Sequence, residues 1–65
     1  MDTIPYKHIK TIAKRYGYQR LKHFKQRDAN RYKATVGSTG ARIMVNTKSE
    51  EVFLWNPFMK KLVKQ

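Results

Sequence analysis

The 65-residue sequence contains no cysteine, three glycines, two prolines and only four acidic residues. Without cysteine the chain can form neither disulfides nor thiolate metal sites. Its longest apolar run, residues 52–55, is far shorter than the roughly 20 apolar residues that a membrane-spanning helix needs. The chain also does not open with the charged and then apolar segments of a secretory signal. We therefore expect an intracellular protein, cytoplasmic or nucleoid-associated, without a membrane span.

The scarcity of acids leaves a large positive charge. Fifteen Lys and Arg against four Asp and Glu give a formal net charge of +11. Such an imbalance opposes compact folding by self-repulsion unless a polyanion neutralises it, whereas solubility alone needs a net charge of only about 2 to 8. Most of the cations lie between Lys7 and Lys33, where Asp28 is the only acid. The charge favours nucleic acid as the partner, with an acidic protein surface or an anionic membrane as alternatives.

The length allows one small domain, residues 1–65, and its first segment has the pattern of an amphipathic helix over residues 3–16. Thr3 is a suitable N-cap, Pro5 fits the first turn, and Gly17 can end the helix in the left-handed conformation. Spacing at i, i+3, i+4 and i+7 predicts one apolar helix face, made of Ile9, Ile12, Ala13 and Tyr16.

Three strands of an antiparallel meander are predicted by period-two alternation over residues 31–36, 41–46 and 51–55. If each of the two connecting loops has four residues, the apolar side chains of all three strands fall on one face. That agreement is the requirement that fixes the register of a half-buried sheet. The register predicts five cross-strand pairs: Val36 with Ala41, Ala34 with Ile43, Tyr32 with Val45, Val45 with Val52, and Ile43 with Leu54.

Two further segments complete the predicted fold. Residues 18–27 fit either a helix or a strand; we choose a strand, with one side formed by Tyr18, Arg20, Lys22 and Phe24. Asn56 is a good N-cap and Pro57 suits the first helical position, which predicts a C-terminal helix with an apolar stripe of Phe58, Met59, Leu62 and Val63. The predicted class is α+β: an N-terminal helix, a three- or four-stranded antiparallel meander, and a short C-terminal helix.

The second face of the predicted sheet interleaves basic and aromatic residues. One row across the strands is Lys33, Met44 and Phe53, and the next is Thr35, Arg42 and Trp55. Aromatic rings can stack on bases, worth about 1–3 kcal/mol per base, while Lys and Arg follow the phosphates. Alternatively, the C-terminal helix folds over Phe53 and Trp55 and makes this face a second small core. The sequence leaves both arrangements open.

Catalytic and metal chemistry find little support. The two histidines, His8 and His23, could serve acid–base cleavage of RNA, but no pattern brings them together. Metal-ligand spacing is absent, and the Gly-Ser-Thr-Gly loop at residues 37–40 lacks the Gly-Lys-Ser/Thr of a P-loop. The predicted element order resembles that of double-stranded-RNA-binding domains and of HicA-type RNA-cleaving toxins, but the lysine motif of the former and the Gly-Ser-His-His of the latter are not reproduced. We expect no enzyme, no metal and no cofactor.

These patterns predict a non-catalytic nucleic-acid-binding protein that acts through phosphate contacts with modest sequence preference. The predicted phosphate contacts are Lys7, Lys10, Lys14, Arg20, Lys22, Arg31, Lys33 and Arg42. The predicted stacking residues are Phe53 and Trp55. The alternatives are a small basic inhibitor or adaptor of a protein partner, such as a viral protein acting on a host nucleic-acid enzyme, and a ribonucleoprotein component. The sequence does not determine whether the partner is DNA or RNA, whether it is single- or double-stranded, or which oligomeric state the protein has.

Overall fold

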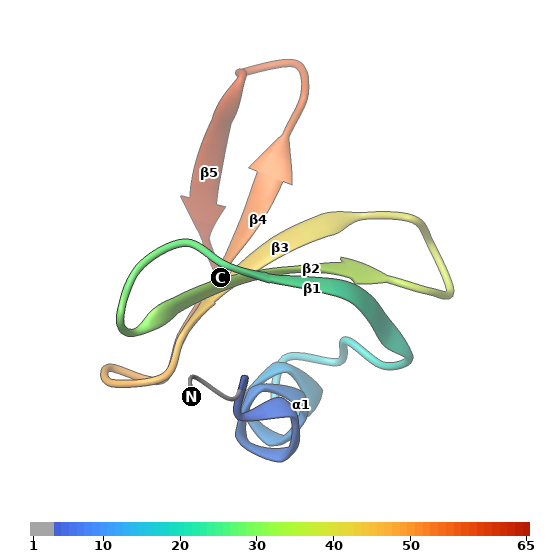
Figure 1. The fold of residues 1–65 in the computed structure, drawn as a ribbon. Coiled ribbons are helices and arrows are strands. Elements are labelled where there is room, and N and C mark those ends of the chain that lie inside the picture. Colours follow the sequence, from blue (N-terminus) through green and yellow to red (C-terminus); the bar gives the residue numbers. More distant parts are fainter. Residues whose placement is uncertain (1–3) are drawn as a thin grey trace.

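The computed structural model describes residues 4–65, which form one helix and a five-stranded antiparallel sheet (Figure 1). The elements in chain order are α1 (Tyr6–Lys14), β1 (Leu21–Gln26), β2 (Arg31–Val36), β3 (Arg42–Asn46), β4 (Glu51–Asn56) and β5 (Lys61–Lys64). Neighbouring strands in the sheet are also neighbours in the sequence, so the sheet is a meander. Within this described part, no helix has the length and apolar character needed to cross a membrane.

The predicted N-terminal helix is confirmed in its buried face. Its three fully buried side chains are Ile9, Ile12 and Ala13. Tyr16 was wrongly assigned to that face: the helix ends at Lys14, and Tyr16 is 41% exposed. Gly17 follows with a φ of +87°, a left-handed conformation that glycine adopts without a steric cost. Pro5 occupies the N-cap position, and Thr3, the expected cap, lies outside the described residues.

The register predicted for the three central strands is confirmed. Tyr32 pairs with Val45 and Ala34 with Ile43 between β2 and β3, and the same face continues into β4 through Val52 and Leu54. These side chains form a single core with the buried face of α1. We call the opposite side of the sheet, turned away from α1, the open face.

Residues 18–27 do contain a strand, but the predicted division of its side chains is wrong. Lys22 pairs with Thr35 and Lys25 with Lys33, so β1 holds one more residue than β2 between these pairs. This β-bulge is accompanied by a φ of +55° at His23, and it reverses the alternation beyond it. Phe24 therefore packs against the core instead of sharing the open face with Lys22.

The predicted C-terminal helix is wrong, and with it the three- or four-stranded sheet. After Asn56 the chain makes a turn and returns as a fifth strand, in which Leu62 pairs with Trp55 and Val63 with Leu54. The helix that would have covered Phe53 and Trp55 is therefore absent from the described residues, and the resemblance in element order to the two RNA-associated families is lost with it.

The Asn56 side chain does cap backbone N–H groups, but those of a turn. Its Oδ1 accepts hydrogen bonds from the N–H groups of Phe58 (2.9 Å) and Met59 (3.0 Å). Lys60 then adopts a left-handed φ of +53°, which reverses the chain where a helix would continue. The β3–β4 loop repeats this design, because Asn46 Oδ1 accepts from Lys48 and Ser49 before Glu50 at φ +59°.

The β4–β5 hairpin gives the sheet its shape. Figure 1 shows the hairpin rising from the β1–β3 layer on the side opposite α1, so the open face is concave. An ion pair between Lys64 Nζ and Glu51 Oε2 (2.8 Å) joins β5 to the start of β4. The Gln65 N–H also donates to the Val52 carbonyl oxygen (2.9 Å). The hairpin is thus held at its base, next to the main core.

We predict that Gly37→Ala loosens the attachment of β1. The Gly37 N–H donates to the Arg20 carbonyl oxygen (2.8 Å), and an added Cβ would overlap that same oxygen. Overpacking of this kind costs about 1–3 kcal/mol of unfolding free energy, measurable by urea denaturation. Ser38→Ala in the same turn is the control and should change stability by less than about 0.5 kcal/mol. Equal effects of the two substitutions would contradict the prediction.

We also predict that the Glu51–Lys64 pair stabilises the hairpin over a defined pH range. Hydrogen bonds from Lys64 and then Ser49 lower the pKa of Glu51 below its ordinary value of 4.5, and the bond to Glu51 raises the pKa of Lys64 above 10.5. The stabilisation is therefore complete between these ordinary values and is lost as the pH falls through the lowered pKa of Glu51.

Glu51→Gln should consequently lower the thermal midpoint at pH 7, and its difference from wild type should shrink as the pH falls through the lowered pKa of Glu51. Lys64→Gln is the matched variant and should lower the midpoint at pH 7 to a similar extent, because it removes the other half of the same pair. A difference between wild type and Glu51→Gln that does not shrink as the pH falls would show that the carboxylate charge is not the cause.

Candidate nucleic-acid interface

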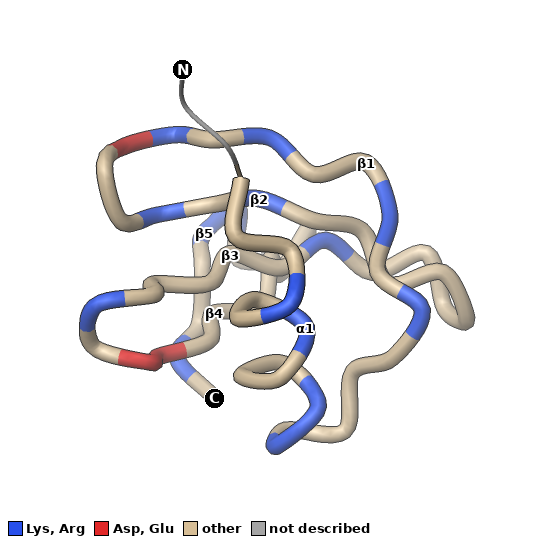
Figure 2. The backbone as a smooth tube through the Cα atoms, turned by 60° about the horizontal axis from the view of Figure 1, so that its bottom comes forward, with Lys and Arg blue, Asp and Glu red and all other residues tan. Residues whose placement is uncertain are grey.

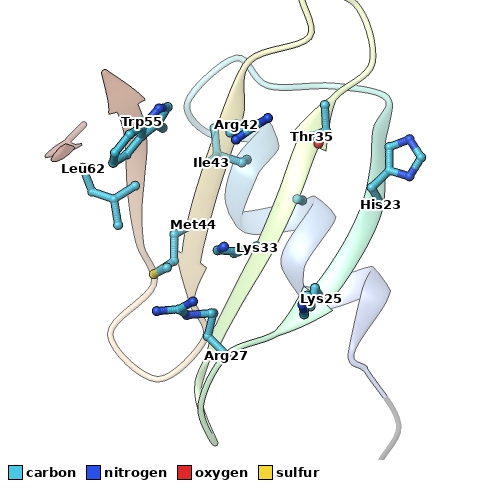
Figure 3. A pocket seen from close by; sticks show the side chains of 11 residues that line it. His23, Lys25, Arg27, Lys33, Thr35, Arg42, Ile43, Met44, Trp55 and Leu62 are labelled. Carbon is cyan, nitrogen blue, oxygen red and sulfur yellow. The ribbon is translucent and has the colours of Figure 1, made fainter. Parts of the chain in front are cut away.

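The concave open face contains a cavity of about 430 Å³ (Figure 3). Residues from all five strands and Arg27, which directly follows β1, surround it, which is possible because the β4–β5 hairpin stands up beside the β1–β3 layer. We call this cavity the sheet groove. Its lining residues are His23, Lys25, Arg27, Lys33, Ala34, Thr35, Arg42, Ile43, Met44, Trp55 and Leu62.

The lining of the sheet groove is divided by chemistry. Lys25, Arg27 and Lys33 come from β1, the residue after it, and β2, and we call them the basic side. Met44, Trp55 and Leu62 come from β3, β4 and β5, and we call them the apolar side. Figure 3 shows Trp55 and Leu62 across the groove from Lys25 and His23. Arg42 precedes Ile43 on β3, and extending the register one pair beyond Ile43 and Leu54 places it opposite Trp55.

The cations of the groove carry no ion pair within residues 4–65. Each side-chain carboxylate in that range is bound elsewhere: Asp28 to Arg31, Glu50 to Arg15, and Glu51 to Lys64. Figure 2 shows the described acids confined to the β1–β2 loop and to the β3–β4 connection with the start of β4, while Lys and Arg are spread along the chain. An anion entering the groove would therefore meet positive charge without having to displace a carboxylate.

The apolar side is accessible from solvent. Trp55 is 36% exposed, because β5 lies beside β4 in the sheet and does not cover its ring. Met44 is only 6% exposed, yet it is not part of the main core cluster. Met44 lines the groove between its cross-strand partners Lys33 and Phe53 and adds a mostly buried apolar group to it.

The structure divides the predicted site residues among several places. Lys33, Arg42 and Trp55 line the sheet groove. Lys22 and Phe53 belong to the open face by register but lie outside the groove lining. Three other predicted contacts border a second cavity of about 340 Å³, between α1 and the start of β1; they are Lys10, Lys14 and Arg20.

The remaining two predicted contacts are less well placed. Lys7 is exposed on α1 and lines neither cavity, and Arg31 is engaged with Asp28. The ten predicted residues therefore do not form one continuous site. The groove brings together the part of the prediction that followed from strand register, whereas the helix lysines belong to a separate surface.

Sequence reasoning missed four groove residues. His23 and Lys25 reach the open face because of the bulge in β1, and Leu62 reaches it because β5 is a strand. Arg27 follows β1 directly. One signal for β5 was present: Asn46 and Asn56 lie ten residues apart, and each begins a turn of four residues before the next strand.

Catalytic and metal sites find no geometric support in the described range. His8 lies on α1, on one side of the sheet, and His23 lines the groove on the other. Among residues 4–65, no three side chains of the His, Cys, Asp and Glu types are grouped in a way that could hold a metal ion. The groove instead offers positive charge, one exposed indole ring and no carboxylate from this part of the chain.

Comparison of the chain with protein-family models, with curated proteins and with solved structures gives no match. No relative therefore assigns an activity to the sheet groove or to the second cavity. The function of this chain has to be inferred from its own residues: the cations of the groove, the accessible ring of Trp55, and the basic cavity beside α1.

Proposed function

We propose that the chain is a non-catalytic nucleic-acid-binding protein that uses the open face of its sheet. The observation that carries the proposal is the sheet groove, in which Lys25, Arg27, Lys33 and Arg42 line the same cavity as Trp55 without an ion pair from residues 4–65. Nucleic acid combines closely spaced phosphates with flat aromatic bases, and the groove offers a partner for each. Such a role places the protein inside a cell, with DNA or RNA.

Phosphate contacts account for both the affinity and the modest sequence preference that we propose. Each Lys or Arg that neutralises a phosphate releases condensed counterions, which drives binding irrespective of sequence. Phosphate contacts position a nucleic acid but carry no sequence information themselves. The second cavity, with Lys10, Lys14 and Arg20, supplies a further basic surface along which a longer nucleic acid could continue.

One feature favours a second candidate, a basic adaptor that binds an acidic protein. At the tip of the β4–β5 hairpin, Phe58 is 94% exposed and Met59 is 55% exposed, next to Lys60 and Lys61. Aromatic residues and Met are enriched in protein–protein interfaces. This tip lies outside the sheet groove, so variants at the two places distinguish the candidates.

We predict a strong salt dependence of binding. Each phosphate contact contributes a slope of about −0.9 to log K against log salt for duplex DNA and about −0.7 for single strands. Four groove cations therefore give a slope of about −3 or steeper for either form, measured by fluorescence anisotropy with labelled oligonucleotides. No binding to DNA or RNA at low salt, together with tight binding to an acidic protein, would instead establish the second candidate.

Substitutions that each remove one positive charge show which residues cause the salt dependence of binding. Lys33→Ala and Arg42→Ala should each make the slope shallower by about 0.7–0.9, the value of one contact. Lys48→Ala removes the same charge from the exposed β3–β4 loop, outside both cavities, and should leave the slope unchanged. A Lys48 effect as large as those of Lys33 and Arg42 would show that net charge matters and that the groove does not.

We predict that the protein does not cleave what it binds. Labelled RNA and DNA should stay intact over hours, with or without divalent metal, because His8 and His23 lie on opposite sides of the sheet. The double variant His8→Gln, His23→Gln should give the same result as the wild type in this cleavage assay. Cleavage that disappears in the double variant would contradict the non-catalytic assignment.

A further inference from the structure

The division of the sheet groove into a basic and an apolar side limits the form of nucleic acid that fits it. Lys25 lies on one side and Trp55 and Leu62 lie on the other, and Lys33 and Met44 lie between them as cross-strand partners. A ligand that matches this lining carries negative charge along one edge and apolar, flat groups along the other. The two sides adjoin where Lys33 pairs with Met44, and both belong to one hydrogen-bonded sheet.

A duplex does not have this distribution of charge. Its bases are paired and stacked inside, and its outer surface presents two phosphate backbones with one negative charge per about 1.7 Å of axis. A duplex in the groove would place charged backbone against Trp55 and Leu62 and bury apolar surface without a partner. A single strand instead exposes its phosphates on one side and its unpaired bases on the other.

Trp55 is positioned to receive an unpaired base. Its ring is 36% exposed and lines the groove, while its backbone is fixed between β3 and β5, where Leu62 is its partner. Base–aromatic stacking tolerates any sequence because every base has a π-face. Arg42, the neighbour of Trp55 across β3 and β4, lies where it can bind the phosphate of the stacked nucleotide.

The size of the groove indicates a short site. A volume of about 430 Å³ lies at the lower end of the 300–1,000 Å³ typical of small-molecule sites, enough for a base with its sugar and phosphate but not for a segment of helix. Small β-sheet modules that bind single strands occupy from about 4 nucleotides upwards, and we expect this chain to lie near that lower limit.

From these observations we infer that the sheet groove is a single-strand site, in which a base stacks on Trp55 while the backbone follows Lys25, Arg27, Lys33 and Arg42. The inference rests on the proposed function and deepens it by naming the form of the nucleic acid. It assigns different tasks to the two sides: the basic side supplies salt-dependent affinity, and the apolar side supplies the discrimination of single strands from duplexes.

The test compares three probes of matched charge: a twelve-nucleotide oligothymidylate, the same backbone with abasic sites, and a duplex with the same number of phosphates. The oligothymidylate should quench the fluorescence of Trp55 and bind most tightly. Loss of the stacked base should weaken binding roughly 5- to 150-fold, the equivalent of one stacking contact. The abasic strand should retain the salt slope, because it retains the phosphates.

Trp55→Ala should weaken binding of the oligothymidylate by the same factor and leave binding of the abasic strand unchanged. Trp55→Phe, which keeps a ring, should restore part of the loss. Phe58→Ala is the matched control, because it removes a more exposed ring from the same hairpin outside the groove. Thermal melts of all three variants verify that the fold is kept. If Trp55→Ala unfolds, the binding of Trp55→Phe is compared with that of the wild type instead.

The outcomes separate the inference from the proposed function. Equal or tighter binding of the duplex, or an equal loss with the abasic strand in Trp55→Ala, would overturn the single-strand inference while nucleic-acid binding itself stands. Failure of all three probes to bind at low salt would overturn the proposed function and the inference together. If the oligothymidylate binds more tightly than the other two probes, and Trp55→Ala weakens this binding while Phe58→Ala does not, both the proposed function and the single-strand inference are supported.

Discussion

Burial of one face of α1 against the sheet holds the described chain together. Because α1 is short, the buried area is small, and this determines which parts of the sheet stay exposed. Ile9, Ile12 and Ala13 are fully buried against the apolar residues of the central strands. A helix of nine residues is only about 14 Å long, whereas five strands at about 4.8 Å spacing extend roughly 20 Å. The helix can therefore cover only part of one face. The other face stays in contact with solvent, and this is why it carries basic side chains.

The distribution of acids reinforces that division. Glu50 ties the β3–β4 loop to Arg15 after α1, Glu51 ties β4 to Lys64, and Asp28 pairs within the β1–β2 loop. The carboxylates of residues 4–65 thus brace connections between elements, and none of them pairs with a cation of the sheet groove. Exposed pairs of this kind contribute little individually, so the net charge of +11 remains as self-repulsion in the free protein. A polyanion in the groove would relieve that repulsion, which couples binding to the stability of the fold.

Sequence reasoning succeeded where side-chain periodicity alone decides the structure. The register of β2, β3 and β4 followed from alternation, and it placed Lys33, Arg42 and Trp55 on one face. Sequence reasoning failed where one backbone dihedral angle decides the structure. The Asn-Pro pair at Asn56 can begin either a helix or a turn, and here the left-handed conformation of Lys60 makes it a turn. The bulge in β1 likewise rests on a positive φ at His23, a conformation that a residue other than Gly seldom adopts, so alternation predicted the wrong side for the rest of that strand.

These two failures concern the features that turn the open face into a groove. Without the bulge, Lys25 would follow the alternation onto the helix side, and the basic side would lose one of its three residues. Without the turn after Asn56 there would be no β5, and the hairpin that carries Trp55 and Leu62 would lack its second strand. Departures from local rules are expected where a structure serves a function, since a regular sheet needs none of them. The regular part of this sheet provides the core, and the bulge and the turn after Asn56 supply the concave surface to which we assign the proposed binding.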